Sequence, residues 1–214
     1  SREIAGYPQA ERGHGWAKFQ SLETISGKPK RPPRDLIFAR QCVSVIADLD
    51  SLDPSDRISP MLAALQASGF EKLSDFLVEH PDSDQARPLA GLARSFGNAL
   101  RPALKKRGWL TATPVPQAPC LHVCFLSGTH AIIGLSFPNG ERLWPQGIPR
   151  LRLPKEAPSR SAQKLEEAIQ VLMEEDQRDR WLRAGMSAAD LGAAPGGWTW
   201  ILTRHQLHVI AIDN

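Results

Sequence analysis

The sequence predicts two fold classes in succession: an α+β region up to about residue 150, and then the beginning of an α/β domain. In the first part, short β-rich runs alternate with amphipathic helical segments. In the last part, the order is strand, glycine-rich turn, helix and strand, which is typical of a parallel βαβ unit. The chain has 214 residues, 42% of them hydrophobic, so it can form one large domain or two small ones.

The first region begins with a small module and continues as an α+β arrangement. Residues 15–20 alternate polar and apolar side chains, and residues 27–34 form a basic, proline-rich linker with poor helix potential. From Leu36 onwards, the pattern predicts a strand, then a helix over 58–68 and a strand over 73–78.

Residues 88–107 carry apolar side chains at helical spacing, with basic side chains on the opposite face. We predict that Gly97 and Asn98 divide this segment into two helices. Asn98 is a good N-cap, and Pro102 would then fall in the first turn, where its missing N–H costs little. The region continues with strands over 121–126 and 131–137 and a turn at 138–140.

A further helix is predicted to open within residues 159–164, where a serine can cap its start. Pro154 and Pro158 hold the preceding chain extended, so Ser161 and Lys164 lie within one turn of the helix start and can face the glycine-rich turn. From the residues alone, a capped surface helix without a functional role is the favoured interpretation.

The most informative segment is Asp-Leu-Gly-Ala-Ala-Pro-Gly-Gly-Trp, from Asp190 to Trp198. Residues 188–190 predict a short buried strand, residues 192–197 a tight turn, and residues 198–205 a helix whose open N-terminus faces a ligand. These elements predict a Rossmann-like nucleoside site. An ordinary glycine-rich turn between a strand and a helix is the alternative.

A second apolar run over 207–212 places Asp213 at the carboxyl end of a strand, where a carboxylate can accept both hydroxyls of a ribose. Pro195 removes one N–H from the loop, while Gly196 and Gly197 leave room for a ligand against bare backbone. This loop suits a compact, uncharged or cationic ligand better than a diphosphate.

The pattern D-x-G-x-x-P-G-G-W resembles the first motif of S-adenosylmethionine (SAM) methyltransferases, especially the FtsJ-like ribose 2′-O-methyltransferases. Residues 147–168, together with Leu-Ile-Phe-Ala-Arg-Gln at 36–41, resemble the RlmM family of bacterial 23S ribosomal RNA cytidine 2′-O-methyltransferases. The resemblance covers the chain in motif order and spacing and is diffuse before Leu36. It implies a partial ferredoxin-like module with its basic linker over 1–35, a THUMP-like RNA-binding domain over 36–150, and the start of a Rossmann-like methyltransferase domain over 151–214.

The activity that this resemblance implies is SAM-dependent methylation of a ribose 2′-oxygen of a cytidine in 23S ribosomal RNA. Lys164 matches the first lysine of the family's K-D-K-E tetrad and would have a supporting role, since the general base is expected beyond residue 214. The residues that would bind SAM are Ser161, Gly192, Ala194, Pro195, Gly196, Gly197, Trp198 and Asp213.

Two alternatives remain open: an RNA-binding module without catalysis of its own, and a SAM methyltransferase that acts on another RNA position. The net charge of +3 permits a nucleic-acid partner without requiring one. Ordinary solvated faces are the alternative explanation for the basic clusters. These clusters comprise residues 27–34, Arg101, Lys105, Lys106, Arg107, Arg150, Arg152, Lys155 and Arg160.

Composition excludes several other classes of protein. Three cysteines without a paired framework favour a reducing compartment, and the chain has no apolar run long enough to span a bilayer, so we expect a cytoplasmic protein. Cys120, His122 and Cys124 share a strand face, but neighbours there are roughly 6.6 Å apart, so no metal site is expected. We expect the chain to be truncated at both ends, since it starts at serine and supplies only two strands of the second sheet.

Overall fold

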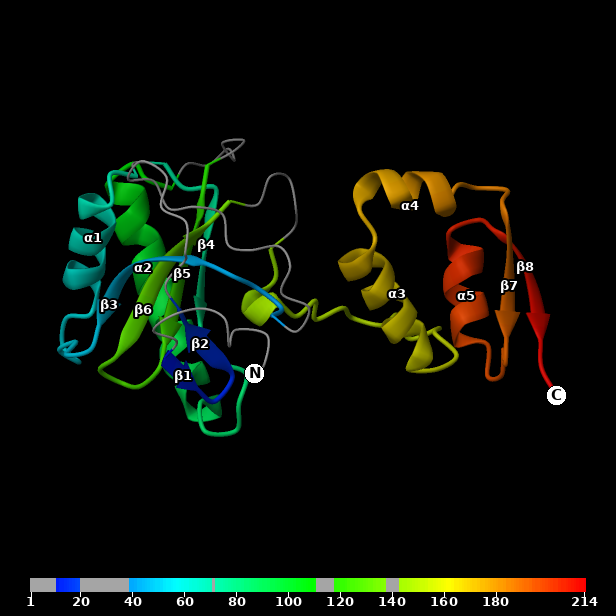
Figure 1. The fold of residues 1–214 in the computed structure, drawn as a ribbon, viewed down its shortest axis with the longest axis horizontal. Helices are drawn as coiled ribbons and strands as arrows, with labels where there is room; N and C mark the ends of the chain where they lie inside the picture. The colour runs from blue at the N-terminus through cyan, green and yellow to red at the C-terminus, as the bar shows by residue number, and fades with distance from the viewer. Residues whose placement is uncertain (1–10, 20–38, 71, 111–117, 138–142) are drawn as a thin grey trace. The chain divides into compact units, whose positions relative to one another are not determined.

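The computed structural model describes residues 11–19, 39–70, 72–110, 118–137 and 143–214. The chain divides into two compact units, which we call unit 1 (Ser1–Ile148) and unit 2 (Pro149–Asn214) (Figure 1). The linker predicted at 27–34 and the turn predicted at 138–140 lie outside the described residues.

Unit 1 is built on a mixed four-stranded sheet with the order β3-β6-β5-β4. The hairpin strands β5 (Cys120–Phe125) and β6 (Ala131–Ser136) pair antiparallel at its centre. On the outer sides, β3 (Ser44–Leu49) pairs antiparallel with β6, and β4 (Asp75–Glu79) pairs parallel with β5. A separate small hairpin consists of β1 (Glu11–Gly13) and β2 (Trp16–Lys18).

Helices α1 (Ile58–Ala67) and α2 (Ala90–Lys106) cover one face of this sheet. The 3₁₀ turn η2 (Arg87–Leu89) leads into α2. Alternate residues of β5 point towards these helices, as expected for a strand with a side-chain period of two. The Phe96 ring of α2 meets the Phe125 ring of β5 edge-on, with 5.2 Å between centroids. The fully buried side chains of this core include Leu65, Leu100, Leu104, Val123, Phe125, Ile133 and Leu135.

The predicted break in the second helical segment is wrong, because α2 continues through Gly97, Asn98 and Pro102. One face of α2 is buried without interruption, from Phe96 to Leu100 and on to Leu104. Pro102 cannot donate a hydrogen bond to the Asn98 carbonyl, but both residues are exposed, so water can satisfy that oxygen. Burial of the apolar face therefore outweighs the local preference for a cap.

The opposite face of the sheet contains a buried polar network. His122 Nδ1 lies 3.1 Å from Glu79 Oε1, and His122 Nε2 lies 2.8 Å from Ser136 Oγ. Glu79 Oε2 also accepts hydrogen bonds from the Gln41 amide at 2.6 Å and from the backbone N–H of Gln146 at 2.9 Å. Gln146 belongs to the short 3₁₀ turn η3 (Pro145–Gly147), so Glu79 ties the end of unit 1 to its sheet.

Unit 2 contains a helical layer on a two-stranded parallel sheet. Helices α3 (Ser161–Leu172) and α4 (Glu175–Trp181) come first, and β7 (Ser187–Leu191), α5 (Gly197–Arg204) and β8 (His208–Ile212) form a βαβ unit. The α3–α5 contact is made by buried Ala162, Ile169 and Ile201. The exposed large hydrophobic residues of these two strands are Leu191, Ile210 and Ile212.

Helix α4 was not predicted, although its start is recognisable in the sequence. Glu174 and Gln177 form a capping box, in which each side chain accepts a hydrogen bond from the other residue's backbone N–H. No helix within the described parts of the chain is long and apolar enough to cross a membrane.

Candidate active site

The loop between β7 and α5 has a backbone that only glycine adopts readily. Gly192 has a φ of +76° and Gly196 a φ of +89°, both in the left-handed region. A Cβ atom added at either position would meet no heavy atom within 4 Å. Ala194 and Pro195 lie between these two glycines, joined by a cis peptide bond. The loop is therefore bare backbone that faces open space.

Gly197, the first residue of α5, has a different role. A Cβ atom here would lie 2.1 Å from Ser161 Oγ and 2.4 Å from Ser159 Oγ. Its missing side chain thus makes room for the start of α3 and not for the open side of the loop. This contact brings Ser161 next to the glycine loop.

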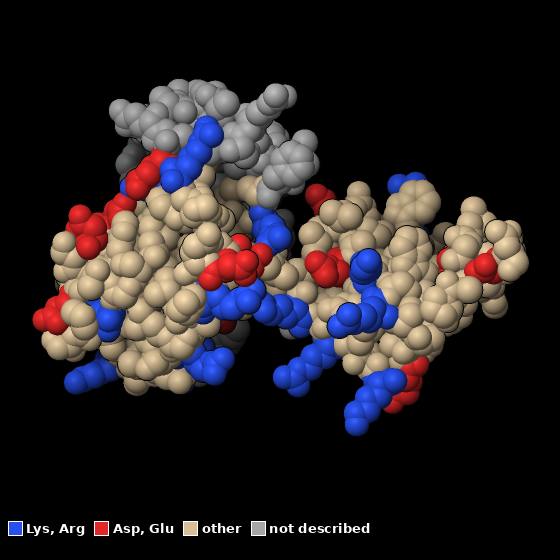
Figure 2. All heavy atoms as spheres, turned by 90° about the horizontal axis from the view of Figure 1, so that it is seen from below, with Lys and Arg blue, Asp and Glu red and all other residues tan. Residues whose placement is uncertain are grey.

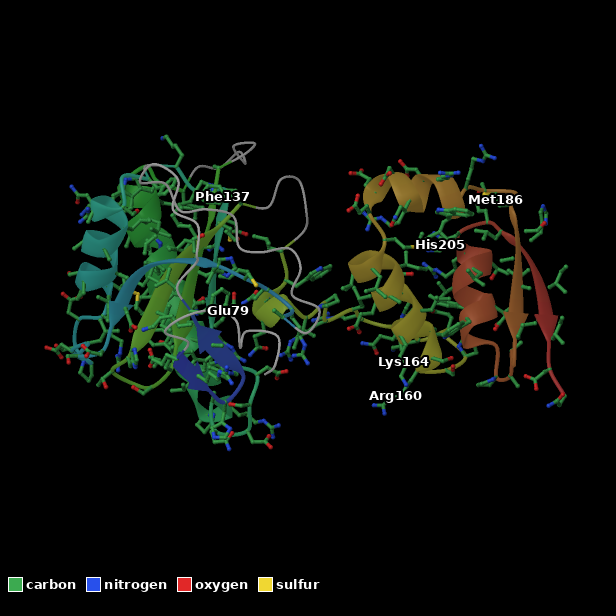
Figure 3. The ribbon with its side chains drawn as sticks, viewed as in Figure 1. Glu79, Phe137, Arg160, Lys164, Met186 and His205 are labelled. Atoms are coloured by element: carbon green, nitrogen blue, oxygen red, sulfur yellow. The ribbon has the colours of Figure 1, made fainter. Side chains whose placement is uncertain are left out.

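The start of α3 is held by the two serines. Ser159 Oγ lies 2.6 Å from Ser161 Oγ and accepts a hydrogen bond from the Ser161 N–H at 3.3 Å. The residue at the N-cap position is Arg160, whose side chain makes no capping hydrogen bond. Lys164 lies one turn further along and is exposed, with Arg160 near it at the lower end of α3 (Figure 3).

Asp190, at the end of β7, is buried and fixes the first turn of α5. Its Oδ2 accepts hydrogen bonds from the Thr199 N–H at 2.9 Å and from the Thr199 hydroxyl at 2.6 Å. The carboxylate satisfies one of the free N–H groups at the helix start, where negative charge is favourable. Asp190 therefore supports the loop from behind. Thr199 was not among the predicted site residues; its signal is a hydroxyl in the first turn of the helix.

Asp213 follows β8 and bonds directly to the loop. One carboxylate oxygen accepts a hydrogen bond from the Ala194 N–H, and the other accepts one from the Asn214 N–H at 2.8 Å. These bonds favour the ionised form, and the pKa of Asp213 is lowered, chiefly by the Ala194 N–H. The Ile212 carbonyl accepts hydrogen bonds from the N–H groups of Gly192 (2.8 Å) and Ala193 (3.1 Å). The end of β8 and the loop thus form one structure.

Most of the predicted site residues are linked through these contacts. Asp213 meets the loop at Ala194, and Ser161 meets it at Gly197. Trp198, the second residue of α5, is 48% exposed, so its indole is accessible from solvent. Lys164 lies on α3, whose start contacts the loop at Gly197, but it shares no hydrogen bond with the loop among the described contacts. The arrangement offers an anionic group and an aromatic ring beside an open backbone.

A metal centre at Cys120, His122 and Cys124 does not fit the geometry. Both ring nitrogens of His122 are used in hydrogen bonds to Glu79 and Ser136. Burial raises the pKa of the Cys120 and Cys124 thiols to about 12, so both are neutral thiols at physiological pH in the metal-free protein. Within the described residues, no group of three or more His, Cys, Asp or Glu side chains could hold a metal ion.

Comparison with known proteins gives a match for each of the two units. Residues 157–214, which include all the predicted site residues, match the FtsJ-like methyltransferase model, and residues 56–137 match the model for the N-terminal part of ribosomal RNA large subunit methyltransferase M. A methyltransferase of that name from Xanthomonas axonopodis pv. citri is 55% identical over 211 residues, which is 99% of this chain. Over almost its whole length, the chain is thus similar to ribosomal RNA large subunit methyltransferase M.

Two further relatives have a similar degree of identity to the chain. The proteins from Xanthomonas oryzae pv. oryzae and Xanthomonas campestris pv. campestris are 54% and 53% identical to the chain, each over 99% of it. The chain spans about 60% of the length of these relatives.

Proposed function

We propose that this chain supplies the cofactor loop and the RNA-recognition region of an enzyme that methylates 23S ribosomal RNA. The methyl group would pass from SAM to the ribose 2′-oxygen of a cytidine. The observation that carries the proposal is the hydrogen-bonded unit of the glycine loop and Asp213, within the segment that matches the FtsJ-like model. The relatives' name supports ribosomal RNA as the substrate.

The open backbone of the loop supports SAM as its ligand. SAM is compact and carries a reactive methyl group on a positively charged sulfur. The open space beside Gly192 and Gly196 would admit its methionine and ribose against bare backbone. Asp213 stays ionised because backbone N–H groups stabilise it, and its remaining lone pairs can accept ribose hydroxyls. The exposed Trp198 indole offers an apolar surface to the adenine.

The chain's other residues would bring the RNA hydroxyl into line with the methyl group. Ser161 and Lys164 lie on the first turn of α3, which packs against the loop at Gly197. We assign Lys164 a supporting role, in which its charge helps to place the hydroxyl and shapes the local field. Alignment of the two reacting groups would provide much of the rate enhancement.

The charge distribution supports RNA as the partner. Residues 150–164 contain five Lys or Arg residues and one Glu. Lys and Arg side chains gather on the side of unit 2 that is seen from below, the side to which the carboxyl end of β7 points (Figure 2). Phosphate contacts there would make RNA binding fall steeply as salt rises. We assign residues 36–150 to a THUMP-like RNA-binding domain and residues 1–35 to part of a ferredoxin-like module, and we place the protein in the cytoplasm, where ribosomal RNA is modified.

Labelled SAM and unmodified 23S ribosomal RNA test the proposal directly. The full-length enzyme that contains this chain should place label on one ribose 2′-oxygen, and mapping the label identifies the nucleotide. RNA binding without label in the RNA would favour a binding module. Label on a base or at a site other than a ribose 2′-oxygen would favour a SAM methyltransferase of different specificity.

The cofactor assignment has a matched pair of variants. Gly196→Arg adds a long side chain to the open side of the loop, and we expect it to abolish SAM binding measured by calorimetry. Gly185→Arg is the control, because Gly185 has a similar φ of +83° and open space beside it but precedes β7, at the other end of that strand. Equal SAM affinity in the two variants would show that the loop is not the cofactor site.

A further inference from the structure

A small pocket lies in unit 1 at the C-terminal ends of α1 and α2. It is lined by Gln66, Gly69, Phe70, Arg107 and Trp109 and has a volume of about 270 Å³. Among the described residues, the lining combines two aromatic rings, a guanidinium group and an amide, and includes no carboxylate. Proteins bind flat aromatic groups with this combination of side chains.

The pocket walls are fixed by the surrounding structure. The Trp109 backbone donates to the Leu104 carbonyl at 3.1 Å and accepts from the Leu73 N–H at 2.9 Å, and its indole packs partly against the core. The Arg107 guanidinium lies 5.0 Å from the centre of the Trp109 ring and donates to Gln66 Oε1 at 3.1 Å. These contacts reduce the freedom of the lining before a ligand binds, which favours affinity.

Two glycines keep the entrance open. Gly69 follows α1 with a φ of +75°, and Gly108 follows α2 with a φ of +69°. A Cβ atom at either position would meet nothing within 4 Å. Both turns therefore expose backbone beside the aromatic side chains.

Basic residues lie next to the pocket lining along the chain. Lys105 and Lys106 are exposed in the last turn of α2, and Arg107 follows them. Lys72 is also exposed, and its ammonium group donates to the Gly108 carbonyl at 3.0 Å. Cations beside an aromatic pocket match a ligand in which a flat base is attached to phosphates.

We propose that this pocket binds an unstacked base of a single-stranded RNA segment, and that Lys105 and Lys106 contact the flanking phosphates. The inference rests on the proposed function of the chain in RNA recognition. The base stacks on Trp109 or Phe70, and the amide of Gln66 lies within the same pocket. A base in a duplex is already stacked and paired, so the pocket selects single-stranded segments.

A second tryptophan–arginine pair in unit 2 fits this ligand less well. Arg204 lies 4.7 Å from the centre of the Trp200 ring, in a groove of about 370 Å³. That groove is also lined by Glu166, which lies 3.6 Å from His205. This carboxylate repels phosphate, whereas the lining of the pocket in unit 1 includes no carboxylate among the residues that the structure describes.

Binding of a fluorescent single-stranded RNA of about 12 nucleotides, followed by anisotropy over a range of salt, tests the pocket. The double variant Lys105→Glu/Lys106→Glu should bind about 10-fold more weakly or worse, and its log–log salt slope should fall by about 1.4, since each lost phosphate contact contributes about 0.7. The control Arg87→Glu/Arg94→Glu makes the same charge change on exposed residues at the other end of this helical segment. It should change affinity less than about 3-fold, because exposed charges that distant are screened.

Two further measurements locate the base. Trp109→Leu should weaken binding at least about 5-fold with little change in salt slope, because stacking is not an ion-release effect. Since Trp109 also packs against the core, RNA containing 5-iodouracil provides a test in the unaltered protein. Photo-crosslinks should map to Phe70 or Trp109.

Three results would refute the proposed role of the pocket. These are an equal loss of RNA affinity in both charge-reversal variants, photo-crosslinks confined to other residues, or an equal loss of affinity for double-stranded RNA. The methylation assay on the unaltered protein separates this inference from the proposed function. If the unaltered protein transfers the methyl group and the Lys105→Glu/Lys106→Glu variant binds RNA normally, the RNA-binding role of the pocket is refuted and the methyltransferase proposal stands. Crosslinks at the pocket without any methyl transfer refute the methyltransferase proposal and retain the pocket.

Discussion

The hydrogen bond between the Thr199 hydroxyl and the buried Asp190 carboxylate predicts a measurable loss of stability in Thr199→Val. Valine has nearly the shape of threonine and a similar helix propensity, so the substitution removes chiefly the donor at 2.6 Å. In the variant, the Asp190 carboxylate still accepts a hydrogen bond from the Thr199 N–H but loses the one from the hydroxyl. A hydrogen bond to a charged group contributes about 1.5–3 kcal/mol to stability. We take about 2 kcal/mol, which corresponds to about a 30-fold change in the equilibrium between the closed and open states of α5.

Amide hydrogen exchange across α5 measures this change locally, without interference from the unfolding of unit 1. Protection factors of the α5 amides should fall about 30-fold in Thr199→Val and should be largely restored in Thr199→Ser, which keeps the hydroxyl. Thr203→Val is the matched control on the same helix, because the exposed Thr203 hydroxyl donates to a neutral acceptor, the Trp200 carbonyl, at 2.9 Å. If Thr199→Val and Thr203→Val reduce protection equally, the bond to Asp190 contributes no more to the stability of α5 than the Thr203 bond does, which refutes the prediction.

Three other perturbations follow from contacts in the two units. Gly197→Ala should lower the denaturation midpoint of unit 2 by an overpacking cost of about 1–3 kcal/mol, because its Cβ would lie 2.1 Å from a serine oxygen; an unchanged midpoint would contradict the α3–α5 contact. Ser136→Ala should cost about 1–3 kcal/mol in urea unfolding, because it leaves a buried His122 nitrogen without its partner, and Ser136→Thr should preserve more of the stability. Cys120 and Cys124, with pKa values of about 12, should resist thiol reagents at pH 8, where about one thiol in ten thousand is ionised, and should react on unfolding; rapid labelling of the native protein would refute the burial argument.

The same thiols predict how stability depends on pH. Because their folded pKa is raised above the unfolded value, the unfolded state loses protons first as pH rises. Their contribution to stability is therefore complete below about pH 8 and declines from there towards pH 12.

Much of the local structure could be predicted from the sequence. The helix predicted over 58–68 is confirmed as α1, and the strands predicted over 121–126 and 131–137 are confirmed as β5 and β6 within one residue. The order of strand, loop, helix and strand in unit 2 is also confirmed. These elements are encoded by hydrophobic period and by turn residues, both of which are local properties.

Other features depended on partners distant in the sequence. The break predicted at Gly97 and Asn98 did not occur, because a continuous buried face holds α2 together. His122 was considered only as a metal ligand, whereas its actual partners are Glu79, on a neighbouring strand, and Ser136. Strand pairing brings these three residues together, and a local sequence pattern cannot predict which strands pair.

The glycine loop shows how the two sources of information divide. The sequence by itself determined where the chain must turn and which residue types surround the turn, because Gly192, Pro195 and Gly196 restrict the backbone regardless of context. Only the tertiary structure decided that Gly197 admits the start of α3 and that Asp190 bonds Thr199 and Asp213 bonds Ala194, without which the turn would have no fixed shape. The reason is physical: backbone preference acts within a few residues, whereas packing and buried hydrogen bonds require atoms that only the folded chain brings together.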